Sequence, residues 1–298
     1  MNTNTMVLGG VAVVVIAAVS LMLLRDRSVD EAERPPPPRS TVAGRASWAA
    51  LDVAAFADAQ VEIEHLRKQN EVDWSAVRAA YRRTLPVVRA TDLRQGSSYE
   101  SEMAAALERC EKGERPRVHQ QVIAKGLQHV AVLGIDEELR SMSAGADAAK
   151  TAMARITSFA KGIRATFVRR DRDYFGEQPT LAKALDDALG DLRAAARAEE
   201  QRRQAAQALG DAIARTYALS VLYEIEEIEK LRGSDREACE VKRMEAIIFF
   251  RIIAGRVAEQ DAQARGEIET MLKASPDQMN ATALESLLQR GLPGLALR

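Results

Sequence analysis

The sequence predicts an all-α protein with an N-terminal single transmembrane helix, a Pro-rich stalk and an antiparallel helical-bundle domain. Three observations lead to this fold class. Alanine, arginine, glutamate and leucine dominate the 298 residues, and these side chains lose little rotamer freedom in a helix. Apolar residues recur at helical spacing over most of the chain. No stretch alternates apolar and polar residues for long enough to predict a strand.

The first element is residues 6–24, MVLGGVAVVVIAAVSLMLL, which carry no charge. A bilayer core takes about 20 apolar residues in a helix, so we expect one span within an anchor of residues 1–27. A cleaved signal peptide is the alternative. It needs a basic segment before the apolar run and a small-residue cleavage site after it, and neither is clear here.

The orientation of this span rests on two conflicting signals. Arg25 and Arg27 come directly after the span and no basic residue precedes it, which places the C-terminal domain in the cytoplasm by the positive-inside rule. Short N-terminal anchors of bacterial proteins more often export the domain behind them, and large domains cross the membrane largely regardless of charge. We therefore expect a single-pass protein of the bacterial inner membrane with a periplasmic domain; the cytoplasmic side stays open.

The stalk covers residues 28–46. Its four consecutive prolines, Pro35–Pro38, exclude helix and favour an extended polyproline conformation. Such a segment acts as a semi-rigid spacer, so we expect it to hold the domain away from the membrane.

The helical domain is expected to cover residues 47–298. Apolar stripes and glycine or proline punctuation predict helices at about 53–66, 74–85, 99–111, 117–139, 146–170, 179–192, 199–231, 235–265 and 281–290. The second of these is expected to stop at Pro86, because proline breaks a helix interior. Residues 121–139 resemble residues 207–225, which leaves two readings open: the ordinary likeness of alanine-rich amphipathic helices, or a weak internal duplication.

Several function classes are disfavoured. The 42 basic and 43 acidic residues nearly cancel, so nucleic acid is not an expected partner. No G-x-S-x-G, G-x-G-x-x-G or Walker A loop occurs, and we do not expect an enzyme. The two cysteines, Cys110 and Cys239, form no C-x-x-C motif; they either stay free or pair in an oxidising compartment.

The main candidate site is the acidic stretch LYEIEEIEK at residues 222–230. On a helix that turns about 100° per residue, Glu229 falls inside an apolar arc, and Glu224 and Glu226 flank it. The next helix begins after a short link, which predicts antiparallel packing, and there Glu245 interrupts an apolar stripe. A carboxylate in such a stripe must be paired, protonated or bound to a cation. Salt bridges to nearby Arg and Lys residues are one reading and a metal site is the other, because carboxylate oxygens suit iron, manganese, calcium and magnesium.

The segment at residues 72–133 carries W-x-x-V-x-x-x-Y, a small-residue turn, an acidic alanine-rich helix and the basic helix QQVIAKGLQHV. It resembles the helical extracytoplasmic region associated with bacterial high-affinity iron permeases, and a looser likeness extends to residue 255. The likeness implies an accessory module that binds or handles iron for a membrane transport system. In iron-uptake proteins Glu-x-x-Glu is an iron-exchange motif, and Glu224-x-x-Glu227 and Glu226-x-x-Glu229 have that spacing. The permease itself is absent, because the chain has one apolar span.

The sequence supports two function hypotheses. The first is iron binding on behalf of an integral membrane protein complex or iron permease. Its candidate ligands are Glu224, Glu226, Glu229 and Glu245, with His119, His129 and Glu100 as further candidates. Glu100 begins a helix, where a carboxylate is also favoured by the helix dipole. The second hypothesis is a non-metal structural or adaptor subunit that docks onto a membrane protein complex, which predicts an exposed apolar surface.

Overall fold

The computed structural model describes residues 50–142, 146–176, 178–195 and 198–298, all within one compact unit, Ala46–Arg298. Every regular element of these residues is a helix, which confirms the all-α prediction. Among the described helices, none has both the length and the apolarity that a membrane crossing requires. The expected span at 6–24 and the expected stalk at 28–46 lie outside the described residues.

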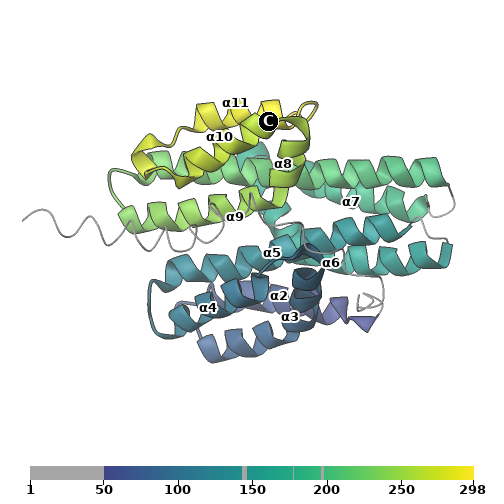
Figure 1. Ribbon diagram of the computed structural model, residues 1–298, viewed down its shortest axis with the longest axis horizontal. Helices are drawn as coiled ribbons and strands as arrows, with labels where there is room; N and C mark the ends of the chain where they lie inside the picture. Colours follow the sequence, from purple (N-terminus) through teal and green to yellow (C-terminus); the bar gives the residue numbers. More distant parts are fainter. Residues whose placement is uncertain (1–49, 143–145, 177, 196–197) are drawn as a thin grey trace, which may run out of the picture. The chain divides into compact units, whose positions relative to one another are not determined.

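The helices are joined in sequence by short links (Figure 1). In chain order they are α2 (Val53–Leu66), α3 (Trp74–Gln95), α4 (Tyr99–Glu111), α5 (Pro116–Ser141), α6 (Ala146–Phe175), α7 (Thr180–Ala194), α8 (Glu199–Leu231), α9 (Arg236–Gln260), α10 (Ala262–Lys273), the 3-10 helix η4 (Pro276–Gln278) and α11 (Ala281–Gly291).

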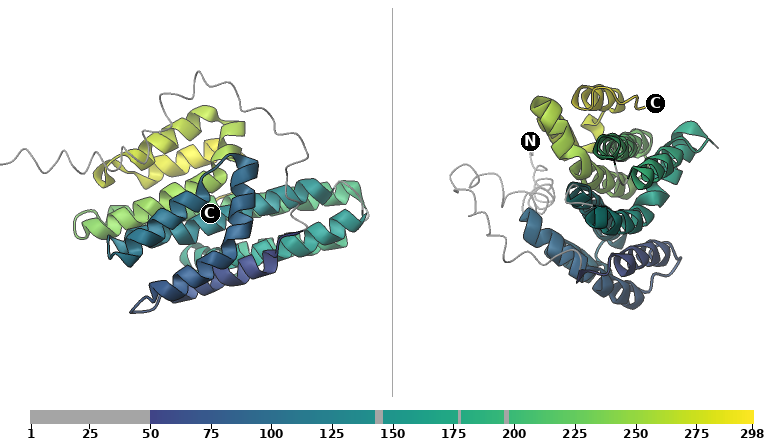
Figure 2. Two further views of the ribbon diagram at one scale, coloured as in Figure 1. Left: turned by 60° about the horizontal axis from the view of Figure 1, so that its bottom comes forward. Right: turned by 90° about the vertical axis from the view of Figure 1, so that its right-hand side faces the viewer.

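Helices α5 and α6 form the middle of this unit. On one side they pack against α2, α3 and α4, and on the other against α7, α8 and α9. Helices α10 and α11 cover α8 and α9 from outside, so the layers follow the order of the chain (Figures 1 and 2). The two similar segments lie in α5 and α8, and both readings of their likeness stay open.

Short polar side chains define where many of these helices begin. The carboxylates of Asp52, Asp73, Asp235 and Asp261 each accept a hydrogen bond from the backbone N–H three residues later, and Asn280 does the same with its amide oxygen. This N-cap satisfies one of the backbone donors that a helix leaves unpaired, and its loss costs about 1 kcal/mol.

The starts of α4, α7 and α11 are also held by a carboxylate of an earlier helix, and α11 has this contact in addition to its Asn280 cap. Asp92 on α3 accepts from the backbone N–H groups of Tyr99 and Glu100 at the start of α4, at 2.8 and 2.9 Å. Asp171 on α6 accepts in the same way from Leu181 and Ala182 near the start of α7, at 2.6 and 2.9 Å. Glu229 on α8 accepts from Ala281, the first residue of α11, at 3.0 Å. These contacts fix the position of a helix start relative to an earlier helix.

Two predicted helix ends are wrong. Helix α3 continues through Pro86 to Gln95. A proline inside a helix costs roughly 3 kcal/mol, but Val87 and Val88 beyond it are fully buried and favour continuing the same face into the core. The helix expected over 235–265 breaks at Asp261, which ends α9 and caps α10 with its carboxylate.

At one of its close approaches, the core brings an aromatic ring against the backbone of a neighbouring helix. Gly134 on α5 lies against the ring of Phe159 on α6, and a Cβ atom at position 134 would overlap that ring. Both Phe159 and its edge-to-face partner Phe56 on α2 are fully buried, with ring centroids 5.7 Å apart. A glycine at position 134 therefore allows the α2, α5 and α6 layers to meet.

Candidate functional site

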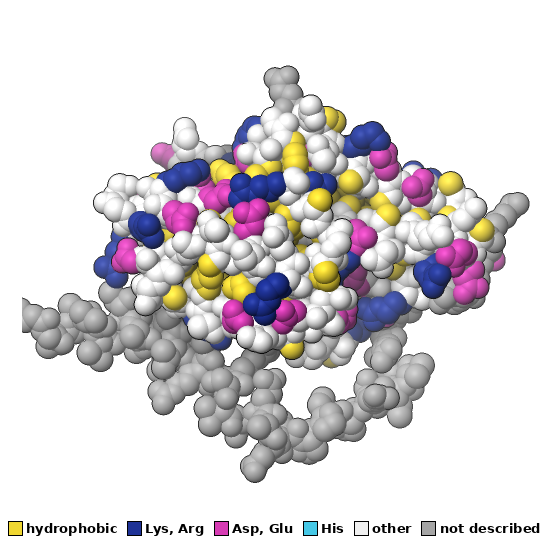
Figure 3. Space-filling view, turned by 90° about the horizontal axis from the view of Figure 1, so that it is seen from above, with side chains coloured by type: hydrophobic (Ala, Val, Ile, Leu, Met, Phe, Trp, Pro, Cys, Tyr) yellow, Lys and Arg dark blue, Asp and Glu magenta, His cyan; other side chains and the backbone are white. Residues whose placement is uncertain are grey.

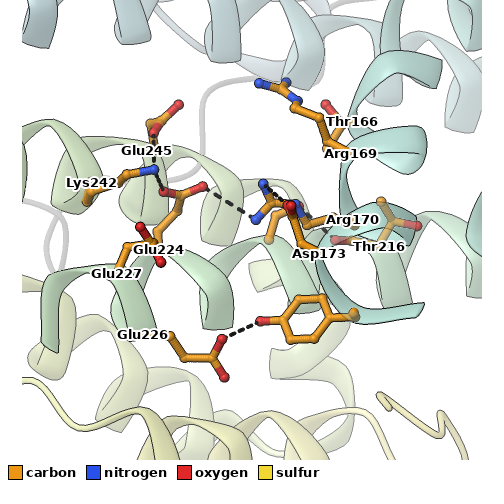
Figure 4. Close-up of polar contacts among 12 residues, drawn as sticks. Thr166, Arg169, Arg170, Asp173, Thr216, Glu224, Glu226, Glu227, Lys242 and Glu245 are labelled. Carbon is orange, nitrogen blue, oxygen red and sulfur yellow. Dashed lines mark hydrogen bonds and ion pairs between the residues drawn. The ribbon is translucent and has the colours of Figure 1, made fainter. Parts of the chain in front are cut away.

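The two carboxylates at the centre of the candidate site share one ammonium group (Figure 4). Glu224 on α8 and Glu245 on α9 are 2% and 8% exposed. The Nζ atom of Lys242 lies 2.7 Å from Oε2 of Glu224 and 3.6 Å from Oε2 of Glu245. Because α8 and α9 are joined by a short turn and pack along each other, Glu224 and Glu245 meet at one level.

The second oxygen of Glu224 faces α6. Its Oε1 atom is 3.6 Å from Nη1 of Arg170. The Nη2 atom of the same guanidinium pairs with Asp173 at 2.9 Å. The Arg170 guanidinium lies 3.8 Å from the ring centroid of Tyr223. Stacking on an aromatic face and pairing with carboxylates are both typical of arginine in a partly desolvated site.

The second oxygen of Glu245 faces α5. Its Oε1 atom is 3.4 Å from Nζ of Lys125, whose side chain is only 1% exposed. The same ammonium lies 5.0 Å from the ring centroid of Phe249. Lys125 is thus a buried cation held by one carboxylate and one aromatic ring.

A second group of ion pairs lies between α2 and α6. Glu64 pairs with Arg67 at 2.5 Å and with Arg169 of α6 at 3.8 Å. The buried ionic network defined by the ion pairs draws on α5, α6, α8 and α9, and its members are Lys125, Arg170, Asp173, Glu224, Lys242 and Glu245. Glu64, Arg67 and Arg169 form a separate group of pairs whose charges act on Lys125 without a direct contact.

Burial and charge act in opposite directions on these groups. Burial, with Glu245 nearby, raises the pKa of Glu224 to about 7. Burial lowers the pKa of Lys125 to about 8, although Glu245 opposes the change. For Glu245 burial also opposes ionisation, but Lys125 and Lys242 outweigh it and hold the pKa below the usual value. The pKa values of Glu224 and Glu245 therefore shift in opposite directions, because the two carboxylates have different cations beside them.

Several of these ion pairs lack hydrogen-bond geometry. The Nζ atom of Lys125, Nη1 of Arg170 and Oε1 of Glu64 are buried and have no hydrogen-bond partner in the described structure. Charge attraction in a low-dielectric interior holds these atoms, and such attraction depends less on direction than a hydrogen bond does.

The other predicted glutamates point elsewhere. Glu226 accepts a hydrogen bond from the Tyr174 hydroxyl at 3.0 Å and pairs with Arg298 at 2.6 Å. Glu229, which was expected inside the apolar arc, is half-buried and caps α11. Within LYEIEEIEK it is Glu224 that is buried, whereas Glu229 lies at the edge of the buried face of α8.

The outlying candidates are also separate. Glu100 forms a bidentate pair with Arg89 at 2.7–3.0 Å on the surface. The His129 Nδ1 atom is 2.8 Å from the Tyr99 hydroxyl, and burial together with Arg251 lowers the pKa of His129 to about 3. His119 is half-buried, and burial, Arg109 and Arg115 lower its pKa.

Of the seven predicted ligands, only Glu224 and Glu245 come together. In the described part of the chain, no three His, Cys, Asp or Glu side chains are grouped as metal ligands. Calcium and magnesium take about six or more oxygen ligands, whereas these two carboxylates already have Lys242, Arg170 and Lys125 as cationic partners. The donor set at this point therefore fits an ammonium group better than a metal ion.

Sequence reasoning missed Lys125 and Arg170, the two cations that come from other helices. A signal for Lys125 was present, because Val118 and Val132 stand seven residues before and after it and so place it on an apolar face. Both valines are buried. Arg170 offers no such signal, since it lies in a run of charged residues.

A second feature is a shallow groove between α10 and α11, with a volume of about 1070 Å³. We call it the α10–α11 groove; its lining is Gln263, Gly266, Glu267, Thr270, Met271, Ala274, Gln278, Ala283, Ser286, Leu287 and Arg290. Figure 3 views the domain from this side, where hydrophobic side chains show between charged side chains of both signs. The lining consists mainly of small or uncharged residues.

Comparisons with protein-family models, with curated proteins and with solved structures gave no match to this chain.

Proposed function

We propose that this protein is a helical adaptor subunit that receives a helix of a membrane protein complex in its α10–α11 groove. The observation that carries this proposal is the spacing of small residues along the groove. Gly266, Thr270 and Ala274 stand at intervals of four along α10 and its C-terminal end, and all line the groove. Residues at this interval share one face of a helix, and small side chains there let another backbone come close.

The charges beside the groove support a partner helix without strong charge. Arg290 on α11 lies 3.6 Å from Glu267 on α10 and 2.9 Å from Asp261, so the rim charges compensate one another. Met271 and Leu287 supply apolar contact area between them. An amphipathic helix that presents an apolar face to such a groove is a common mode of recognition.

The proposal also includes the anchor and stalk expected from the sequence. Residues 6–24 would hold the protein in the bacterial inner membrane, with the helical domain on the periplasmic side. Attachment to the membrane raises the effective concentration of the domain near a membrane partner, so that a modest groove affinity suffices.

The test is photo-crosslinking from the groove in native membranes. A crosslinking residue at Thr270 is expected to give a discrete adduct with an integral membrane protein, and Gly266→Leu is expected to abolish it by filling the groove. Open space surrounds Gly266, so the larger side chain leaves the fold intact. Gly190→Leu on α7 is the matched control, because Gly190 is equally open. An adduct that survives Gly266→Leu, or no adduct at all, would overturn the proposal.

Iron handling stays a second candidate, and it requires Lys242 to leave the two buried carboxylates, Glu224 and Glu245, that now share its ammonium. An iron ion would take the place of this ammonium between the two carboxylates. Anaerobic titration of the full chain with ferrous and then ferric iron, followed by calorimetry, tests this. Binding that is lost in Glu224→Gln/Glu245→Gln and kept in the control Glu226→Gln/Glu229→Gln would support it. Equal binding by all three proteins, or none, would exclude this pair as the site.

A further inference from the structure

Lys125 is a buried cation whose hydrogen-bonding capacity is left unused by its protein neighbours. Its side chain is 1% exposed, and its Nζ atom has no hydrogen-bond partner among the described residues. Glu245 at 3.4 Å and the Phe249 ring centroid at 5.0 Å balance its charge without accepting a hydrogen bond. An ammonium group has three N–H donors, and a buried charged donor without an acceptor is costly. The site of Lys125 therefore calls for a further acceptor.

Two carboxylates near Lys125 have unused acceptor capacity. In the part of the chain that the structure describes, neither oxygen of Glu245 accepts a hydrogen bond, although Lys125 and Lys242 lie 3.4 and 3.6 Å away. The Oε1 atom of Glu64 is buried and also accepts none. Unused acceptors on α2 and α9 thus accompany the unused donors on α5.

Glu64 and Lys125 act on each other without direct contact. Burial opposes the ionisation of Glu64, but Lys125, ahead of Arg67 and Arg169, holds the pKa of Glu64 well below its usual range. The ion pairs of Glu64 within the described structure are to Arg67, Lys68 and Arg169, and none is to Lys125. Lys125 therefore lies near Glu64 but beyond the distance of an ion pair, which is the arrangement that a small bridging molecule can span.

The charges around this point select the kind of molecule that fits. A metal ion would be repelled by the ammonium of Lys125, and an anion would be repelled by Glu64 and Glu245. Water carries no net charge, can accept from an ammonium and can donate to two carboxylates. Buried waters in proteins typically make about three hydrogen bonds to groups that are otherwise unsatisfied.

We propose that Lys125, Glu64 and Glu245 form a binding site for an ordered internal water molecule. The water accepts a hydrogen bond from Nζ of Lys125 and donates to Oε1 of Glu64 and Oε1 of Glu245. It connects the ion pairs between α2 and α6 to the buried ionic network, so that one polar connection runs from α2 to α8. The site does not rest on the adaptor proposal, because none of its three residues lines the α10–α11 groove.

The first test is a high-resolution crystal structure of the full chain, from crystals grown in chloride and in bromide. A water is expected at about 2.7–3.2 Å from Nζ of Lys125 and at a similar distance from Glu64 and Glu245. An anomalous bromide signal at this point would overturn the proposal, because the ligand would then be an anion. A direct hydrogen bond from Nζ to either carboxylate, with no water beside it, would also overturn it.

The second test counts long-lived waters in solution by magnetic relaxation dispersion of water nuclei. Lys125→Met keeps an apolar side chain of similar length and removes the donors, so the dispersion is expected to lose the share of one bound water. Tyr217→Phe is the matched control, because the buried Tyr217 hydroxyl already donates to Gln128 at 3.2 Å and its loss should leave the count unchanged.

Equal dispersion in the wild type and Lys125→Met would overturn the proposal, as would an equal loss in both variants. Circular dichroism shows whether each variant keeps its helices. If Lys125→Met does not fold, the crystal structure of the native chain decides by itself.

Discussion

The Lys242 ammonium lies 2.7 Å from the carboxylate of Glu224, so a side chain that is 24% exposed neutralises one that is only 3% exposed. The pair joins α9 to α8, and Arg170 and Lys125 extend it to α6 and α5. Replacing a buried ion pair by apolar residues is often neutral, but removing one partner leaves an uncompensated charge. The consequence for stability therefore depends on which partner is removed.

Removing the ammonium is expected to destabilise the protein. Lys242→Met leaves Glu224 and Glu245 close together with one cation fewer, and we expect the free energy of unfolding to fall by roughly 2 kcal/mol. Urea unfolding followed by circular dichroism measures this. Lys230→Met is the control: its pairing with Glu227 is largely exposed, so a change within about 0.5 kcal/mol is expected. If Lys242→Met and Lys230→Met lowered the free energy of unfolding equally, the loss could not be attributed to the buried ion pairs of Lys242.

The stability contribution of Glu224 is expected to depend on pH. Burial and Glu245 raise the pKa of Glu224 from 4.5 to about 7 in the folded protein. A carboxyl group whose pKa is higher when folded binds its proton more tightly in that state. It therefore adds stability at low pH that is lost as the pH rises from about 4.5 through 7. Compared with Glu224→Gln, the wild type should lose stability over this interval.

The measurement is urea unfolding of both proteins at several values between about pH 5 and pH 8. Asp136, whose pKa burial raises to about 6, is present in both proteins and drops out of the difference. Glu226→Gln, on the same helix, shows what the loss of a half-buried carboxylate does by itself. A pH-independent difference between wild type and Glu224→Gln would contradict the expectation.

The two thiols are expected to be unreactive in the native protein. Cys110 and Cys239 are both free and both 1% exposed. Burial and Glu111 raise the pKa of Cys110 to about 12, and burial together with Asp235 raises the pKa of Cys239. Because only the thiolate attacks, an aromatic disulfide reagent at about pH 8 should react slowly with native protein. In denaturant it should detect two thiols per chain. Fewer than two would indicate a disulfide, and rapid native reaction would contradict the burial.

A methyl group at position 134 is expected to disturb the contact between α5 and α6. In Gly134→Ala the new Cβ atom would overlap the Phe159 ring, so the free energy of unfolding should fall by about 2 kcal/mol. Gly190→Ala on α7 is the matched control: nothing lies near its Cβ position, and alanine should stabilise the helix by about 0.5–1 kcal/mol. Thermal unfolding of both variants distinguishes the two effects, and a shift of the same sign would refute the packing argument.

The helices could be predicted from the sequence because their apolar periodicity and their polar caps are local. The ends of α3 and α9 were predicted wrongly. At Pro86 a non-local packing effect determines whether the helix continues, and at Asp261 a local cap determines where it stops. Buried Val87 and Val88 carry α3 past Pro86, and the Asp261 carboxylate stops α9 inside an otherwise continuous helical pattern.

The site could be predicted only in part. The short link between α8 and α9 brings Glu224 to the level of Glu245, which agrees with local helix geometry. Which glutamate is buried, Glu224 or Glu229, depends on the rotation of α8 about its axis. Glu229 instead accepts a hydrogen bond from the backbone of Ala281, 52 residues later, at the start of α11. The partners Lys125 and Arg170 come from other layers of the domain, and pairings of that kind are not encoded in the spacing of one segment.

The carboxylates that cap α4, α7 and α11 all precede the helix they cap. Asp92 comes before Tyr99, Asp171 before Leu181, and Glu229 before Ala281. A ribosome delivers the chain from its N-terminus, so each of these helices emerges after the residue that receives its first N–H groups. An earlier helix that has already formed offers the later one a prepared starting point. The order of synthesis therefore favours assembly of the layers one upon another, and a circularly permuted chain that reverses this order is expected to fold more slowly to the same structure.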